Sequence, residues 1–92
     1  MKKVRVLLFA SIREKVGKNS LELDIENNMD LKDFFQIIAK LNPELANISK
    51  KLNRNETIPY LLVLDGKQVN LANKNIIKPG AELGILPPVS GG

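Results

Sequence analysis

The sequence contains neither cysteine nor histidine among its 92 residues. The missing cysteines exclude disulfides and thiolate nucleophiles, and the two absences together remove the usual zinc ligands and the commonest general base. No paired-carboxylate motif takes their place. We therefore expect no bound metal, no bound cofactor and no enzymatic activity of the chain by itself. Chemistry at this chain is then carried out by another protein.

Aromatic residues are also scarce, and the four present are Phe9, Phe34, Phe35 and Tyr60. All four stand in apolar runs, so we predict that they belong to the core. The net charge is +4, but the basic residues are spread over the whole chain. A surface that stacks single-stranded nucleic acid needs exposed aromatics among basic residues. We therefore predict no nucleic-acid partner.

The sequence lacks an apolar run long enough to span a bilayer. The apolar run near the N-terminus is interrupted by Arg5 and closed by Arg13, and no small-residue cleavage site of a signal peptide follows it. We therefore expect a cytoplasmic protein with no membrane contact.

The sequence does contain the patterns of a single domain with several strands and one main helix. Its length fits a single domain, and its 43% hydrophobic and 26% charged residues are typical of a folded globular protein. Period-two alternation predicts strands at residues 3–10, 19–25, 58–64, 67–71 and 82–86. Asp65-Gly66 predicts a tight hairpin turn between the third and fourth of these.

The main helix is predicted from Asp30, a good N-cap, to Leu41. Its apolar side chains recur at helical spacing and form one face, which we expect to pack on a sheet: Leu31, Phe34, Phe35, Ile38 and Leu41, with Ile37 widening it. A shorter helix is predicted at residues 43–53. One further helical turn around Ile12 and Val16 should end at Gly17.

This order of elements predicts an α+β fold with a mixed sheet of about five strands and one main helix packed on one face. If the first and last strands pair, they do so in parallel at the centre of the sheet, which brings Phe9 next to Leu86. We therefore divide the chain into a domain of residues 1–86 and a flexible C-terminal tail of residues 87–92.

The tail consists of Pro87, Pro88, Val89, Ser90, Gly91 and Gly92. The two prolines favour an extended chain, and the two glycines carry no side chain, so this end can enter a narrow channel. One interpretation is that its carboxylate is activated inside the nucleotide site of another enzyme. The other is a frayed terminus without a role.

Residues 9–14 (FASIRE) with Gly17, and residues 86–92 (LPPVSGG), resemble the MoaD-like small subunits of molybdopterin synthases, which are ubiquitin-like β-grasp sulfur carriers of the MoaD/ThiS superfamily. The resemblance covers the whole chain in order and length. Its most specific part is the ending.

The resemblance implies that a MoeB-like enzyme uses ATP to adenylate the carboxylate of Gly92 and that a sulfur donor then converts it into a thiocarboxylate. It also implies a MoaE-like large subunit, with which the chain forms a heterotetramer and to whose active site the sulfur is brought. The acceptor is then a pyranopterin precursor in molybdenum cofactor biosynthesis. The large subunit is expected to bind the tail through Pro87, Pro88, Val89, Ser90 and Gly91.

Phe9 and Leu86 match family positions on the hydrophobic surface that meets both partners, so Phe9 is either an interface residue or a core residue. Two alternative functions remain beside the carrier in cofactor synthesis. The chain could be a ubiquitin-like modifier joined to lysines through its diglycine end, or a sulfur carrier for another pathway such as thiazole synthesis.

Overall fold

The computed structural model describes residues 2–87 of the chain. The elements in order are β1 (Lys2–Leu8), α1 (Ala10–Val16), β2 (Ser20–Ile25), β3 (Met29–Asp30), α2 (Leu31–Leu41), the 3-10 helix η1 (Pro43–Leu45), α3 (Ala46–Asn53), β4 (Leu61–Leu64), β5 (Lys67–Gln68), β6 (Ile76–Ile77) and β7 (Glu82–Leu86). The predicted tail positions Pro88, Val89, Ser90, Gly91 and Gly92 lie outside the described residues.

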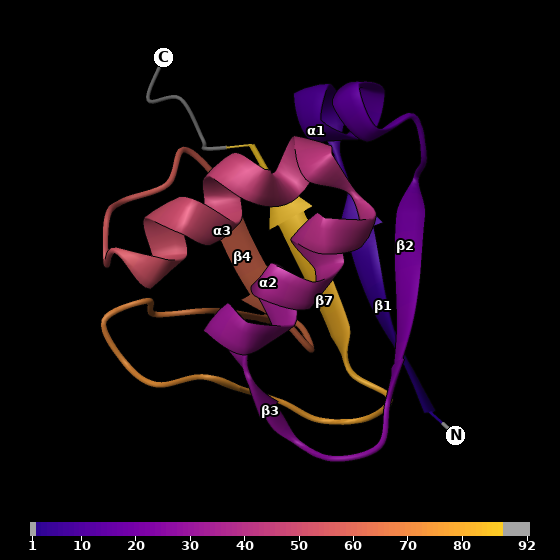
Figure 1. Cartoon of the computed structure of the whole chain (residues 1–92), viewed down its shortest axis with the longest axis vertical. Helices are drawn as coiled ribbons and strands as arrows, with labels where there is room; N and C mark the ends of the chain where they lie inside the picture. The colour runs from indigo at the N-terminus through magenta and orange to yellow at the C-terminus, as the bar shows by residue number, and fades with distance from the viewer. Residues whose placement is uncertain (1, 88–92) are drawn as a thin grey trace.

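Five strands form one mixed sheet in the order β2-β1-β7-β4-β5 (Figure 1). β1 and β2 are antiparallel, as expected for strands joined by a short connection. β1 and β7 are parallel neighbours, and Val6 lies opposite Leu83 in their register. The first and last strands therefore do pair, and they pair in parallel at the centre of the sheet, as expected for that case.

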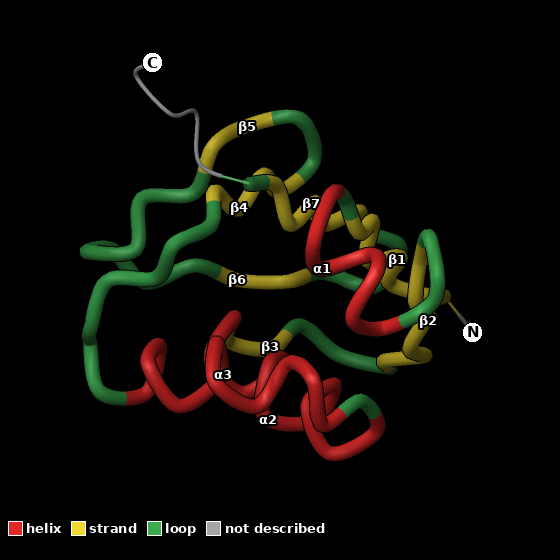
Figure 2. The backbone as a smooth tube through the Cα atoms, turned by 90° about the horizontal axis from the view of Figure 1, so that it is seen from above, coloured by secondary structure: helices red, strands yellow, loops and turns green. Residues whose placement is uncertain are grey.

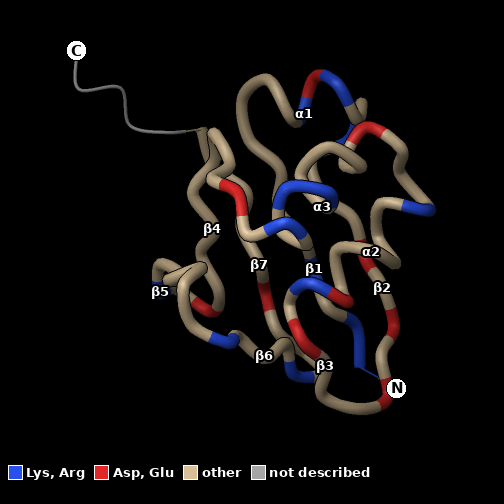
Figure 3. The backbone as a smooth tube through the Cα atoms, turned by 60° about the vertical axis from the view of Figure 1, so that its left-hand side comes forward, with Lys and Arg blue, Asp and Glu red and all other residues tan. Residues whose placement is uncertain are grey.

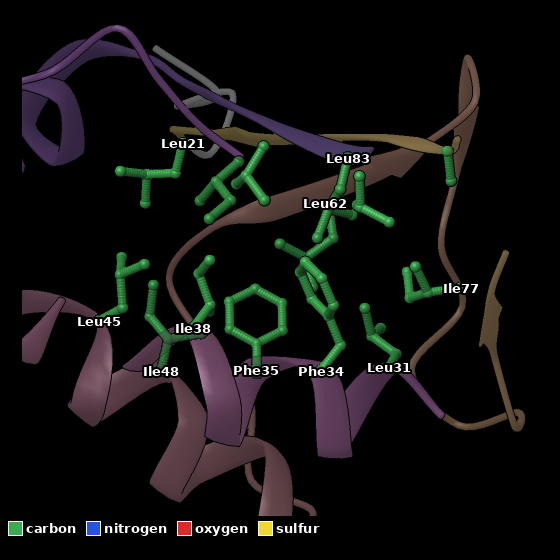
Figure 4. Close-up of a cluster of buried hydrophobic side chains, with 14 of the residues drawn as sticks. Leu21, Leu31, Phe34, Phe35, Ile38, Leu45, Ile48, Leu62, Ile77 and Leu83 are labelled. Carbon is green, nitrogen blue, oxygen red and sulfur yellow. The ribbon is translucent and has the colours of Figure 1, made fainter. Parts of the chain in front are cut away.

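The helices α2 and α3 cover one face of this sheet as a second layer (Figure 2). Phe34 and Phe35 on α2 are completely buried and meet edge to face, with ring centroids 6.5 Å apart. They point toward the strands that carry Leu62 and Leu83 (Figure 4). The predicted apolar face of this helix is thus the centre of the core. Leu41 and Ile37 are the exceptions: they are 62% and 38% exposed, so the prediction that they pack on the sheet was wrong.

Local signals in the sequence give the expected local structures. The side chain of Asp30 accepts a hydrogen bond of 2.8 Å from the backbone N–H of Lys32 and caps α2. Gly17 ends α1 with φ of 81°. Asp65 and Gly66 have φ of 50° and 85°, the positive values that the tight hairpin between β4 and β5 requires.

Several predicted boundaries were wrong. β1 ends at Leu8 rather than residue 10, and β4 begins only at Leu61, two residues after Pro59, which has no N–H to donate to a sheet. β5 is shorter than predicted. No strand was predicted between residues 71 and 82, yet β6 lies there and pairs with β3, with Met29 opposite Ile77.

Candidate functional site

An uncharged apolar surface covers the sheet on the face opposite α2, around the end of β7. We call it the outer patch, and its members are Leu7, Phe9, Leu61, Val63 and Leu86. In β7, the buried residues Leu83 and Ile85 point to the core. Glu82, Gly84 and Leu86 therefore belong to the outer face, since alternate residues of a strand point to opposite faces. β4 carries no charged residue and β7 carries only Glu82, so both are mostly tan in Figure 3.

The strand register brings the outer patch together. Gly84 lies between Leu7 on β1 and Val63 on β4. One step further along, Leu86 lies opposite Leu61. Leu7, Leu61, Val63 and Leu86 are all half-buried, so apolar surface remains available on this face.

Gly84 is the floor of the outer patch. A Cβ atom placed on it would lie 3.1 Å from Leu86 Cδ1, 3.8 Å from Phe9 Cε2 and 3.9 Å from Val63 Cβ. Its φ is not positive, so glycine is needed here for space rather than for backbone conformation. Phe9 and Leu86 therefore approach each other over the missing side chain, as the sequence predicted for these two residues.

Phe9 ends the extended run of β1 and stands just before α1. Its φ of −130° and ψ of 154° continue the strand, so its side chain falls on the same face as Leu7. Ala10 then has φ of 52°, a left-handed value that costs a non-glycine residue about 1 kcal/mol and turns the chain into the helix. Phe9 is 39% exposed, so the prediction that all four aromatics are core residues is wrong for it.

Pro87 follows the outer patch directly and is exposed. Because Leu86 pairs with Leu61 at the end of β7, the chain leaves the sheet beside the patch. The five remaining tail positions of the predicted site lie outside the described residues, so the structure places only Pro87, Phe9 and Leu86 of the predicted set.

Sequence reasoning missed Leu7, Leu61 and Val63 as members of this surface, and it missed Gly84 as its floor. The alternation in β4 could have indicated two faces, since Leu62 is core while Leu61 and Val63 are not. A glycine between the two buried residues Leu83 and Ile85 was the signal for a close approach on the other face.

Within residues 2–87, no group of three or more Asp or Glu side chains is placed to hold a metal ion. Within the same range, none of the helices has the length and apolarity needed to cross a membrane.

The sequence matches the family model described as ThiS family over residues 6–92. A molybdopterin synthase sulfur carrier subunit from Dictyostelium discoideum is 32% identical over 88 residues, which cover 96% of this chain and 94% of that protein. The protein of the same description from Chlamydomonas reinhardtii is 28% identical over 89 residues, covering 97% of this chain and 98% of that protein.

Among solved structures, small archaeal modifier protein 1 from Methanosarcina acetivorans is similar with a TM-score of 0.70 and 29% identity, covering 100% of this chain and 98% of that one. The fold is therefore the ubiquitin-like β-grasp predicted from the sequence.

Proposed function

The chain belongs to the ThiS family and is MoaD-like, and from this premise we propose that it is the sulfur carrier subunit of a molybdopterin synthase. The observation that carries the proposal is the 32% identity with a curated subunit of that description, over nearly the full length of both proteins. The family match extends to residue 92 and so includes the diglycine end. Because the chain acts as a carrier, catalysis resides in its partners.

The chemistry takes place at the carboxylate of Gly92. A carboxylate is a poor acyl electrophile, so a MoeB-like enzyme first joins it to the AMP part of ATP and releases pyrophosphate. Sulfide released by a sulfur donor then attacks the acyl carbon and expels AMP, which leaves a thiocarboxylate. The chain has no cysteine whose thiol could capture the activated acyl group first. ATP is thus a substrate of the activating enzyme and not a cofactor of the carrier.

A MoaE-like large subunit binds the tail. Gly91 lets the end pass through a narrow channel, and Pro87, Pro88, Val89 and Ser90 extend it into the active site where a pyranopterin accepts the sulfur. We propose that carrier and large subunit assemble as a heterotetramer in the cytoplasm. We propose no nucleic-acid partner and no membrane contact.

The outer patch is the surface that we assign to both partners. It lies beside Pro87, so a protein that holds the tail also covers Phe9 and Leu86. An exposed apolar surface of this kind is typical of a protein–protein interface, and its aromatic residue is the natural anchor.

A reconstituted synthase tests the tail and the patch together. Deletion of Gly91 and Gly92 is expected to abolish molybdopterin formation. Phe9→Ser is expected to weaken binding to the large subunit by tenfold or more, because a central aromatic anchor contributes about 2 kcal/mol or more. Ile76→Ser is the matched control, since Ile76 is 38% exposed against 39% for Phe9 and lies in β6, outside the five-stranded sheet. Undiminished synthesis by the truncated chain would refute the proposal.

A second candidate function is conjugation to lysine side chains through the diglycine end. It is favoured by the 29% identity with the small archaeal modifier protein, in a match that covers 100% of this chain and 98% of that protein. It predicts isopeptide bonds between Gly92 and lysines in the proteome of the source cell, and a deep search that finds none would count against it. Delivery of sulfur to another pathway is distinguished from both functions by a transfer assay. The thiocarboxylate form of the chain is mixed with each candidate sulfur acceptor in turn, and the acceptor that takes up the sulfur identifies the pathway.

A further inference from the structure

One flank of α2 exposes apolar side chains that the core does not use. Ile37 and Leu41 are one turn apart, and they are 38% and 62% exposed. The opposite flank of the helix contacts the α3 region, because Gln36 Nε2 donates to Asn53 Oδ1 at 3.0 Å and Lys32 Nζ donates to Asn55 Oδ1 at 2.6 Å. Helical spacing therefore turns Ile37 and Leu41 away from α3.

The element on that side of α2 is β2. In Figures 1 and 2, β2 and α3 lie on opposite sides of the helix. β2 ends the strand order of the sheet and pairs with β1 on one side only, so within residues 2–87 its other edge is free to pair. Leu23 lies on its core-facing side and is only half-buried. The free strand edge and the apolar helix flank thus lie on the same side of the molecule.

The outer face of β2 carries a regular charge pattern. Glu22 and Asp24 are exposed, and in the register they lie opposite Arg5 and Lys3 of β1. Lys3 Nζ also lies 4.0 Å from Glu22 Oε1. On this face, β1 therefore presents a row of positive side chains and β2 a row of negative ones, in a chain whose net charge is +4. A further strand paired with the free edge of β2 would be stabilised most by positive side chains opposite Glu22 and Asp24.

We propose that the free edge of β2 and the flank of α2 together bind an extended segment of another protein by strand addition. The segment carries lysine or arginine at alternate positions, which face Glu22 and Asp24. Its intervening aliphatic residues face Leu23, Ile37 and Leu41. Backbone hydrogen bonds to the edge supply affinity, and the two sets of side chains supply register and direction.

The charge pattern also selects against a second copy of this chain. Two β2 edges paired antiparallel around a two-fold axis would place acidic residues opposite acidic residues, which is unfavourable. The proposed surface is separate from the outer patch, because β1 stands between β2 and β7 in the sheet. It therefore does not use the tail or the interface assigned to sulfur transfer.

The test is a titration of the isotope-labelled full chain with a blocked synthetic peptide that alternates lysine with valine. Amide shift changes are expected along β2 and the C-terminal half of α2. Leu41→Ser should weaken binding by about tenfold, equal to about 1.4 kcal/mol. A peptide that alternates lysine with serine keeps the charge but lacks the apolar side, and it should bind more weakly by a similar factor. Deletion of Gly91 and Gly92 should leave the affinity unchanged.

Charge reversal gives the sharpest outcome. The variant with Glu22→Lys and Asp24→Lys should lose its affinity for the lysine–valine peptide and bind instead a peptide that alternates glutamate with valine. Shift changes centred on β5 or the outer patch would overturn the proposal, and so would an affinity that the charge reversal leaves unaltered. Absence of any shift at millimolar peptide would also overturn it, and the acidic edge would then serve only to prevent association between sheets.

Discussion

Gly84 is the residue whose replacement tests the geometry of the outer patch most directly. Gly84→Val adds a branched side chain where a Cβ alone would lie 3.1 Å from Leu86 Cδ1. We expect a loss of about 1–3 kcal/mol in the free energy of unfolding, the usual cost of overpacking, measured by urea denaturation. Gly84→Ala should cost less, because Leu86 stands at a strand end and can shift by a few tenths of an ångström.

A double variant identifies the cause of the Gly84 effect. Leu86→Ala removes the atom that the new side chain meets first. The combination of Gly84→Val with Leu86→Ala should therefore be less destabilised than the sum of the two single variants. Strict additivity would contradict the packing that we describe at this position.

Asp65 connects the β4–β5 turn to the start of β7. Its Oδ1 accepts a hydrogen bond of 2.9 Å from the N–H of Glu82, its own N–H donates to the carbonyl of Glu82 at 2.8 Å, and its φ is 50°. Asp65→Ala loses the side-chain acceptor and places alanine in a left-handed conformation, so we expect it to cost about 1–2 kcal/mol in thermal or urea unfolding. Asp65→Asn keeps both properties and should be nearly neutral; an equal loss in the two variants would contradict this assignment.

Single residues that determine their own backbone could be predicted from the sequence. Asp30, Gly17 and the Asp65-Gly66 pair act through the chain within a few residues of themselves, so their roles do not depend on the rest of the fold. Leu41 and Ile37 were assigned to a buried face although they are exposed, and for Phe9 the apolar pattern left core and interface open. The exposure of all three depends on what covers them. Apolar pattern alone does not distinguish a buried flank from one that no other element reaches.

The helix α2 offers a matched comparison within one element. Ile38 is 1% exposed and Leu41 is 62% exposed, although both belong to the predicted apolar face. Ile38→Ala should lower the free energy of unfolding by about 2–5 kcal/mol, since it leaves a cavity in the core. Leu41→Ala should change it by no more than about 0.5 kcal/mol. Similar losses for the two variants in urea denaturation would contradict the described orientation of the helix.

Elements were predictable from the sequence where they were long and periodic. α2, β2 and β7 each carry a clear period, and they formed close to their predicted bounds. β3 and β6 have two residues each, too few for any period, and their pairing depends on where α2 begins. The N–H of Leu31 donates to the carbonyl of Asn75 at 2.9 Å, so this small sheet adjoins the start of the main helix.

At the scale of the whole molecule, the parallel pairing of β1 with β7 places the outer patch beside the start of the tail. It places Phe9, at the end of β1, over Gly84 and beside Leu86. The order of the elements predicted this neighbourhood on the condition that the first and last strands pair, and the structure meets that condition. They could not predict that β4 supplies Leu61 and Val63, because that depends on the register of a strand pair distant in sequence.

The central claim is that Gly92 carries sulfur, and the most direct test is the intact mass of the chain. The protein is incubated with ATP, a MoeB-like activating enzyme and a sulfur donor, and its mass is compared before and after. We predict a gain equal to the exchange of one oxygen for one sulfur, absent without ATP and lost when Gly92 is deleted. No gain with an enzyme that is active on another carrier, or a gain that survives the deletion, would contradict the account.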